Sequence, residues 1–401
     1  MMKPVFSGSF TQQAKIPDAA IAAALEVLRH GRLHRYNTVA AEPGETALLE
    51  QEFAHWQGAR YCLACASGGQ AMQIALRAAG VKSGDPVLTN GFTLAPVPGA
   101  IAAVGGATVL VEVTADLVID LADLEQKARN VSARYLLLSH MRGHLVDMKR
   151  LSDIAKRLNL TVIEDCAHTM GASWAGTKSG NFGHAGCFST QTYKHMNSGE
   201  GGLLTSNDPD FMARATILSG SYMLYGRHGA GPDSEYFEGP RLNMPNMSAR
   251  MDNLRAAILR PQLRELDHSI ESWNERYDII AKHLKECSAV ALPKRPDDGK
   301  FVGSSIQFRI PDIHPDTANA LLAGLAQRGV EVKWFGGATP IGFTSSHDSW
   351  RYLQRQSLPV TDNVLASLFD MRLPLAFSLK DCALIADILV DEISAVTRAA
   401  A

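Results

Sequence analysis

The chain has few of the features that mark secreted, membrane-bound or nucleic-acid-binding proteins. It has six cysteines in 401 residues, too few to suggest a fold held by disulfides. No stretch reaches the roughly 18 uninterrupted apolar residues of a membrane span, and Met1 to Gln12 contain no apolar signal core. The formal net charge is -2 at pH 7, so no overall basic field would attract nucleic acid. We therefore expect a cytoplasmic protein without nucleic-acid or membrane partners.

The single CxxC motif, Cys62 and Cys65, does not predict a metal site. A zinc site needs a second pair of ligands at matching spacing, and none follows. Residues 61–66 have the pattern of a buried strand, in which positions three apart face opposite sides. We expect both cysteines to be packing residues, and we expect no bound metal.

Short apolar strands alternate with helical segments through the first half of the chain. Strands are predicted at 61–66, 87–89, 108–113, 134–140, 161–164, 187–190 and 202–206. Helices are predicted at 69–79, 94–104, 121–129, 147–158 and 209–218. This alternation predicts an α/β protein with a mostly parallel sheet covered on both faces.

The regular pattern is lost between Gly220 and Met247, where Gly, Pro, Asn and Tyr are frequent. A loop of this length in a compact enzyme is usually functional. After it, the periodicity predicts a long helix up to about Glu286, and then strands at 305–310 and 330–335 and helices at 316–328 and 379–398. We expect a large domain over residues 1–249, which includes N-terminal helices, a linking helix over 250–285 and a small C-terminal domain over 286–401.

Polar side chains follow the ends of two predicted strands. Asp165 ends one strand, Ser189 lies at the end of another, and Lys194 follows before a glycine-rich turn. In parallel sheets ligands collect at the carboxyl ends of the strands, so we expect these three side chains in one site. Together they can hold pyridoxal 5'-phosphate: the lysine amine forms a Schiff base, the carboxylate pairs with the protonated ring nitrogen, and the hydroxyl meets the phosphate.

Each of these assignments has an alternative. Asp165 could instead cap the next helix. Glu164 is its neighbour, and adjacent strand residues face opposite ways, so only one of the two reaches the cofactor; we expect Asp165. His168, one helical turn on, could donate to the phenolic oxygen of the cofactor, although a histidine considered alone is more often a packing residue.

Two further groups are candidates for cofactor binding. Ser67, Gly68 and Gly69 follow a strand and open a helix, where backbone amides suit a phosphate. Phe92 follows the next strand and is a candidate neighbour of the cofactor ring, with a core role as its alternative.

The order of these motifs resembles that of the DegT/DnrJ/StrS aminotransferases, enzymes of fold type I that aminate keto sugars and keto cyclitols. The resemblance is good over about residues 15 to 285 and holds only in outline after that. It is carried by Glu164-Asp165-x-Ala-His168, Gly180-x-Phe-Gly183, Phe188-Ser189, Lys194, Gly199-Glu200-Gly201-Gly202 and Arg250-Met251. It implies a seven-stranded, mostly parallel sheet in an αβα sandwich and a smaller C-terminal α/β domain.

The resemblance also implies roles for single residues. Lys194 would hold the cofactor covalently, Asp165 would pair with the ring nitrogen, and His168 stands where the family often has Gln. Ser189 and the amides of Gly68 and Gly69 would hold the phosphate.

The resemblance further implies a homodimer with shared active sites. In the family, the loop before the helix at Arg250 reaches into the partner's site. Here Asn246 and Ser248 would contribute to it, and Arg227 or Arg241 could meet an anionic substrate.

Three positions depart from the family pattern. Gly69 replaces a residue that is often Thr, and Leu94 stands where an aromatic ring commonly covers the cofactor. Ser248 occupies the place of the family's partner-donated Asn, and Asn246 lies two residues earlier.

We therefore expect a pyridoxal-phosphate-dependent aminotransferase with a ping-pong mechanism. Glutamate or glutamine would be the donor, and a keto sugar, keto cyclitol or related ketone the acceptor. A sugar dehydratase is disfavoured, because the related dehydratases have histidine where this chain has Lys194. Two alternatives stay open: an enzyme of the same fold that decarboxylates an amino acid or forms a carbon–carbon bond on it, and a non-catalytic ligand-binding protein.

Overall fold

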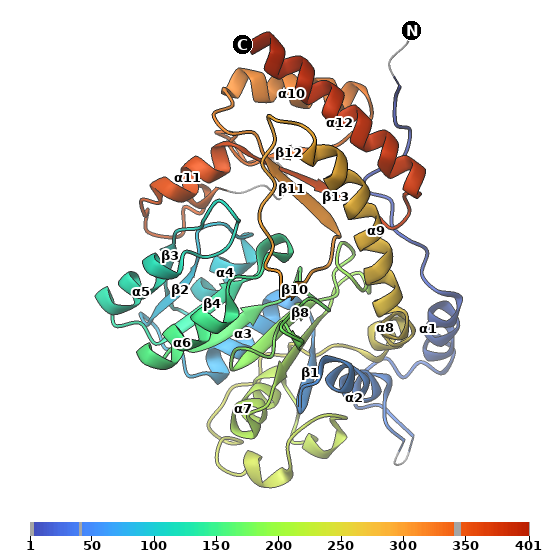
Figure 1. Cartoon of the computed structure of the whole chain (residues 1–401). Helices are drawn as coiled ribbons and strands as arrows, with labels where there is room; N and C mark the ends of the chain where they lie inside the picture. The colour runs from blue at the N-terminus through green and yellow to red at the C-terminus, as the bar shows by residue number, and fades with distance from the viewer. Residues whose placement is uncertain (1–3, 40–41, 341–345, 401) are drawn as a thin grey trace.

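A seven-stranded sheet forms the centre of the molecule (Figure 1). The computed structural model describes residues 4–39, 42–340 and 346–400. The strands lie in the order β1-β9-β8-β5-β4-β2-β3, and β9 runs opposite to its neighbours, while the pairs from β8 to β3 are parallel. Their bounds are β1 Tyr61–Cys65, β2 Pro86–Asn90, β3 Ala107–Val111, β4 Tyr135–Ser139, β5 Thr161–Asp165, β8 Ala185–Ser189 and β9 Gly202–Ser206. The predicted mostly parallel sheet is confirmed, and each of its strands overlaps a predicted one.

Helices cover both faces of this sheet. One face packs against α3 (Gly68–Ala78), α4 (Pro96–Ala103) and α7 (Pro209–Ser219). The other packs against α2 (Glu45–Gln57), α5 (Leu121–Asn130), α6 (Met148–Leu158) and α8 (Asn253–Arg264). Successive strand residues enter opposite layers, which is why these strands are mostly apolar. Cys62 and Cys65 are buried on opposite faces, as predicted.

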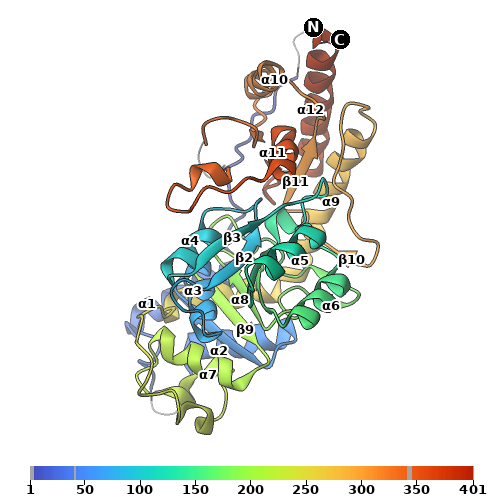
Figure 2. The same ribbon diagram turned by 90° about the vertical axis from the view of Figure 1, so that its left-hand side faces the viewer.

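A second, antiparallel sheet lies in the C-terminal part, in the order β11-β13-β12. Its strands are β11 Ser305–Arg309, β12 Lys333–Trp334 and β13 Leu368–Arg372. It packs with α9 (Leu266–Lys285), α10 (Pro315–Gln327) and α12 (Leu379–Ala400), and α11 (Pro359–Ala366) precedes β13. The rings of Phe6 and Phe10 join this core edge-on to Phe377, with centroids 4.9 and 5.0 Å away. The first described residues therefore pack on the C-terminal part, whose last helix is α12 (Figure 2).

The predicted helix after residue 250 is two helices, α8 and α9, which run in different directions (Figure 1). Helix α1 (Asp18–His30) packs against α8. A small third sheet joins β10 (Gly299–Lys300) to β6 (Ser173–Trp174) and β7 (Thr177–Lys178). No helix in the described ranges is long and apolar enough to cross a membrane.

The stretch from Gly220 to Met247 is irregular, as expected, apart from two short 3-10 turns, Tyr225–Arg227 and Ser234–Phe237. Its His228 is buried against a pair of charges: Arg35 Nη2 lies 2.9 Å from both carboxylate oxygens of Glu50 and 3.0 Å from His228 Nδ1. Burial of a charge is tolerated when it is paired in this way. The network fixes the root of the loop on helix α2.

Candidate active site

The candidate site lies at one edge of the large sheet, where strands end in the same direction. Of the predicted residues, Ser67, His168 and Lys194 follow β1, β5 and β8, while Thr93 and Arg142, which were not predicted, follow β2 and β4. The carboxyl ends of parallel strands form the usual ligand-binding edge of such sheets.

Lys194 and His168 are in direct contact. Lys194 Nζ lies 2.8 Å from His168 Nε2. The backbone N–H of Arg142 donates to His168 Nδ1 at 3.2 Å, so the ring proton of neutral His168 belongs on Nε2. Burial, followed by the charge of Lys194, holds the pKa of His168 well below its usual value, which keeps the ring neutral. His168 can therefore donate its Nε2–H, and only the unprotonated form of the Lys194 amine can accept it.

The pKa of Lys194 fits that arrangement. Burial lowers the pKa of Lys194 to about 8; the charge of Asp165 opposes this shift, and those of Arg142 and Arg372 reinforce it. A pKa near 8 leaves about one amine in ten unprotonated at pH 7, whereas a solvated lysine is almost fully charged. Only the unprotonated amine can attack a carbonyl.

Covalent capture of pyridoxal phosphate by cofactor-stripped protein should therefore speed up as pH rises and level off above about 8. The neutral amine is the reactive form, so the rate follows its fraction through the pKa. Stopped-flow absorbance across pH 6–11 measures this. In Asp165→Asn the midpoint should fall, because the Asp165 charge raises the Lys194 pKa. A midpoint close to that of a free lysine would contradict the prediction.

Asp165 is held by donors on both of its oxygens. It is 8% exposed, and its Oδ1 accepts the backbone N–H of Ala167 at 3.1 Å. Ser139 Oγ donates to Oδ2 at 3.2 Å, and Thr93 Oγ1 donates to Ser139 Oγ at 2.7 Å. Burial raises the pKa of Asp165, while the Ala167 N–H, Lys194 and Ser139 act in the opposite direction.

Ser139 and Thr93 were not among the predicted site residues. They lie next to Asp165 because β2, β4 and β5 are neighbours in the sheet. The side chain of Asn90 fixes Ser139 further, through bonds of 3.0 and 3.1 Å to its backbone. In the sequence, these two hydroxyl groups stand at or shortly after the end of an apolar strand. This position points to the site only once the order of the strands in the sheet is known.

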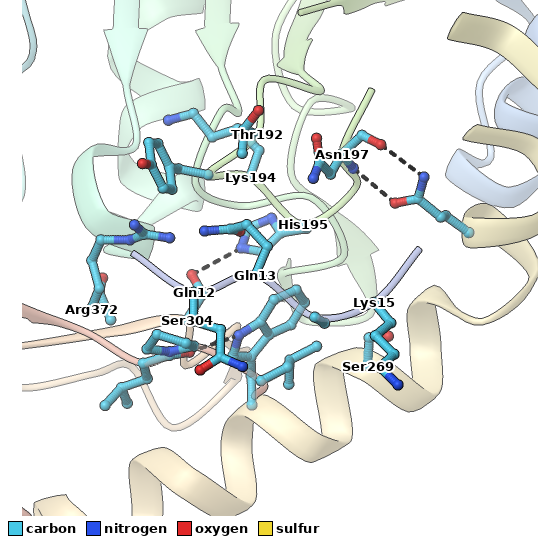
Figure 3. Close-up of a pocket in the computed structure, with 18 of the residues that line it drawn as sticks. Gln12, Gln13, Lys15, Thr192, Lys194, His195, Asn197, Ser269, Ser304 and Arg372 are labelled. Carbon is cyan, nitrogen blue, oxygen red and sulfur yellow. Dashed lines mark hydrogen bonds between the residues drawn. The ribbon is translucent and has the colours of Figure 1, made fainter. Parts of the chain in front are cut away.

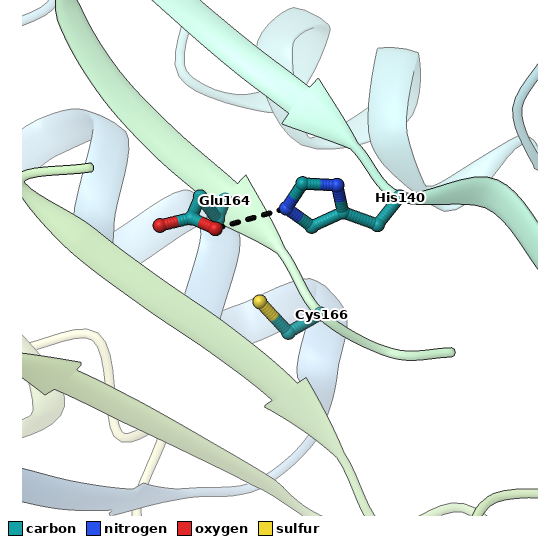
Figure 4. Close-up of side chains that lie close together, drawn as sticks. All are labelled: His140, Glu164 and Cys166. Atoms are coloured by element: carbon teal, nitrogen blue, oxygen red, sulfur yellow. Dashed lines mark hydrogen bonds and ion pairs between the residues drawn. The ribbon is translucent and has the colours of Figure 1, made fainter. Parts of the chain in front are cut away.

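Glu164 points away from Asp165, as expected for adjacent strand residues. Its carboxylate accepts the backbone N–H groups of Gly180, Phe182 and Gly183 and lies 2.9 Å from His140 Nε2. Cys166 lies beside this pair (Figure 4), so the three side chains have the composition of a metal site. Backbone N–H groups already occupy the Glu164 oxygens, so we interpret these three side chains as stabilising the fold. Through Glu164 they fix the turn at 180–183.

The start of helix α3 and Ser189 form a tight cradle. Ser67 caps the helix by accepting the N–H of Gln70 at 3.1 Å. A Cβ on Gly68 would come within 2.9 Å of Ser189 Cβ, so only glycine permits this approach. The Cβ of a residue at Gly69 would meet no such obstacle, since its closest neighbour is Ser67 Oγ at 3.8 Å. The helix start thus brings its free amides next to a hydroxyl, which suits a phosphate.

The other predicted residues do not join this group within one chain. Phe92 is 1% exposed and packs edge-on against Phe335, with centroids 5.1 Å apart, which is the core role that the sequence left open. Asn246 and Ser248 are exposed and bond to each other. Arg227 donates to the Tyr36 carbonyl, and Arg241 pairs with Glu238.

A cavity of about 200 Å³ opens beside Lys194 (Figure 3). Lys194 and His168 lie on its wall together with residues of the N-terminal segment, of α8 and α9, and of the C-terminal sheet. In all, the wall includes Gln12, Gln13, Lys15, Arg142, Thr192, Tyr193, His195, Glu265, Trp273, Ser304 and Arg372. The space next to the reactive amine is therefore shared between the large sheet and the C-terminal part.

Solved structures share this fold. The aminotransferase TlmJ from Streptoalloteichus hindustanus superposes with a TM-score of 0.82 at 21% identity, covering 99% of this chain and all (100%) of that one. The fold is thus that of an aminotransferase.

The sequence identifies the family. Residues 15–389 match the DegT/DnrJ/EryC1/StrS aminotransferase family, to which the chain belongs. A GDP-perosamine synthase from Caulobacter vibrioides is 32% identical over 71% of this chain and 74% of its own length. An L-glutamine:scyllo-inosose aminotransferase from Streptomyces griseus is 31% identical over 74% of this chain and 69% of its own length. A protein named pleiotropic regulatory protein, from Geobacillus stearothermophilus, is 30% identical over 66% of this chain and 68% of its own length. The chain is an aminotransferase.

Proposed function

We propose that this aminotransferase uses pyridoxal 5'-phosphate and that the strand-end edge holds it. The observation that carries the proposal is the Lys194 amine, with its lowered pKa, 2.8 Å from a neutral His168 and at the same sheet edge as a buried carboxylate and the cradle of Gly68 and Ser189. Ser189 and the first amides of α3 would hold the phosphate, Asp165 the ring nitrogen and His168 the phenolic oxygen. The bound cofactor would supply an electron sink for the bonds to the carbon that is aminated or deaminated.

The protein residues then divide the work. Lys194 would hold the cofactor covalently, and its amine, in contact with His168 Nε2, would take up and return a proton at the substrate carbon. Ser139 and Ala167 donate to the ionised carboxylate of Asp165 and oppose the upward effect of burial on its pKa, and a negative charge there would favour a protonated ring nitrogen. The walls from the C-terminal part limit the access of water to Lys194.

We infer a ping-pong reaction with glutamate or glutamine as donor and a keto sugar, keto cyclitol or related ketone as acceptor. The names of the relatives from Streptomyces and Caulobacter support this class. The name of the Geobacillus relative, pleiotropic regulatory protein, is instead in line with the non-catalytic alternative. The presence of Lys194, Asp165 and Ser189 in one site favours catalysis.

A donor-by-acceptor screen tests this assignment. Purified protein is incubated with pyridoxal phosphate and with pairs of one amino acid and one ketone, and the amine product is detected by mass spectrometry. We expect product with glutamate or glutamine and at least one cyclic polyol ketone. Carbon dioxide or a carbon–carbon adduct in place of an amine would instead support the same-fold alternatives.

We also propose a homodimer in which the loop 220–247 completes the partner's site. Asn246 and Ser248 are exposed and are not on the wall of their own subunit's cavity, which is compatible with a place in the partner's site. Tyr222, Met223 and Leu242 in the same loop are exposed. So are Ile21, Leu25 and Leu28, which follow one side of α1. Apolar surface of this extent is typical of an interaction site.

Mixed dimers test the shared site. We expect Lys194→Ala and Asn246→Ala/Ser248→Ala proteins to be weakly active alone and to regain activity when their subunits are exchanged. If one subunit supplies Lys194 and the other the loop, one of the two sites in a mixed dimer carries both lesions and the other carries neither. Subunit exchange is verified with differently tagged chains. No recovery after verified exchange would mean that each site is built from one chain.

A further inference from the structure

A buried carboxylate of the C-terminal sheet points toward the large sheet. The side chains of β13 alternate: Phe369 and Met371 lie in the apolar core of the C-terminal part, whereas Leu368 lies in one cluster with Phe92 of the large sheet. Asp370 therefore faces the same way as Leu368, toward the junction between the two sheets. It is 1% exposed, and a carboxylate buried this deeply needs a partner.

The partner of Asp370 comes from the turn that follows β4. Arg142 Nη2 lies 2.7 Å from Asp370 Oδ2, and both side chains are buried. Gln307, opposite Asp370 on β11, donates to Asp370 Oδ1 at 2.8 Å, and its own Oε1 accepts the Nε2–H of His144 at 2.8 Å. The turn is therefore attached to the C-terminal sheet twice, through Arg142 and through His144.

The same turn packs against His168. Arg142 has φ 56° and Gly143 has φ 84°, and this left-handed conformation is costly at Arg142 because it carries a side chain. A Cβ on Gly143 would come within 3.2 Å of the His168 carbonyl oxygen, so the turn lies directly on the backbone of His168. In this conformation the Arg142 N–H is directed at His168 Nδ1. Strained backbone persists where the surrounding structure enforces it, and the two attachments to the C-terminal sheet do so here.

These contacts form a continuous path from the C-terminal sheet to the reactive amine. Asp370 holds the Arg142 side chain, and the Arg142 N–H places the proton of neutral His168 on Nε2. That nitrogen lies 2.8 Å from Lys194 Nζ. Asp370 itself is not among the described residues that line the cavity, so any effect it has on the reaction must pass through other side chains.

We propose that Asp370 is a positioning residue for the reaction. Through Arg142 it holds the turn at 141–143 in the conformation that orients His168 toward Lys194. The inference rests on the proposed function, in which His168 and Lys194 act on the bound cofactor. It gives the C-terminal sheet a part in setting the geometry of the reactive groups, in addition to its place on the cavity wall.

The tautomer of His168 tests the proposal without any reaction. Solid-state NMR of protein with labelled histidine, with and without added pyridoxal phosphate, shows which ring nitrogen carries the proton, and the His168→Gln variant identifies the His168 signal. The unmodified protein should carry this proton on Nε2. Asp370→Asn keeps the shape of the side chain but not its charge. It should give a mixture of both tautomers, because the Arg142 N–H no longer has a fixed direction.

The donor half-reaction measures the consequence for catalysis. In single turnovers with glutamate, Asp370→Asn should be about ten- to hundred-fold slower than the unmodified enzyme, because a small misplacement of a reacting group is costly. If Asp370 acts through Arg142, the Arg142→Gln/Asp370→Asn double variant should be no slower than Arg142→Gln alone. Full additivity of the two substitutions would contradict this route.

Glu392→Gln is the matched control. Glu392 Oε1 lies 3.1 Å from Arg328 Nη1 in another buried ion pair of the C-terminal part, and neither residue is among the described residues that line the cavity. This variant should lose thermal stability, as Asp370→Asn does, but keep both the His168 tautomer and the rate.

An unchanged tautomer and an unchanged rate in Asp370→Asn, with circular dichroism showing a normal fold, would overturn the proposal. If Asp370→Asn does not fold, the same result in Arg142→Gln would overturn it, since that variant removes the other member of the ion pair. If the unmodified enzyme reacts with no donor, the proposed function fails, while the His168 tautomer still decides the role of Asp370.

Discussion

Lys194→Ala should abolish the covalent link to pyridoxal phosphate and slow transamination by at least about 10²- to 10⁴-fold, the usual contribution of a positioned acid–base group. The physical reason is that one amine performs both tasks, and among the described residues only Lys194 combines a lowered pKa with contact to His168. Borohydride reduction followed by peptide mapping reports the link, and single-turnover absorbance reports the rate. The variant should still bind the cofactor through the phosphate cradle and Asp165.

Lys333 is the matched control for this experiment. Burial lowers its pKa to about 8 as well, but Lys333 lies on β12, outside the cavity wall. Lys333→Ala should therefore keep the covalent link to the cofactor. A reducible adduct that persists in Lys194→Ala, at Lys333 or elsewhere, would show that a lowered pKa alone selects the lysine.

Asp165→Asn should slow the donor half-reaction by about 10²- to 10³-fold, or roughly 3–4 kcal/mol of barrier, with the cofactor still bound. An amide has the shape of the carboxylate but no charge, so it cannot favour a protonated ring nitrogen. The rate is read from single-turnover absorbance with glutamate as donor.

In the same experiment, Ser139→Ala distinguishes the effect of the Asp165 charge from the effect of the orientation of its carboxylate. It removes the donor to Asp165 Oδ2 and leaves the carboxylate in place, so the loss should be below about ten-fold. If instead Asp165→Asn reacts at a near-normal rate, the carboxylate serves only the Ala167 turn, as the capping alternative holds.

Much of the fold was predictable because each strand of the large sheet is a short apolar run buried on both faces. The C-terminal part was predicted less completely. β12 is two residues long, and β13 contains Asp370 and Arg372, whose charges hide the apolar pattern of a strand. Those charges are tolerated because Asp370 is bonded to Arg142 and Gln307.

The site residues were likewise predictable only in part. Lys194, His168 and Asp165 were predictable because each follows a strand at a recognisable spacing, and the structure brings Lys194 and His168 into contact. Arg372 was not predictable, because its approach to Tyr193 depends on how a distant strand packs. The role of Asn246 and Ser248 in the site of a second subunit stays a prediction, because the structure contains a single chain.

We propose that the protein moves an amino group by way of bound pyridoxal phosphate. A single turnover with the amino donor alone tests this proposal most directly. The loaded protein is mixed with glutamate or glutamine in the absence of any acceptor, and the cofactor absorbance and the keto acid released are measured together. We predict that the visible absorbance of the cofactor is lost and that about one molecule of keto acid is released per bound cofactor. An unchanged spectrum with every donor, or bleaching without keto acid, would contradict it.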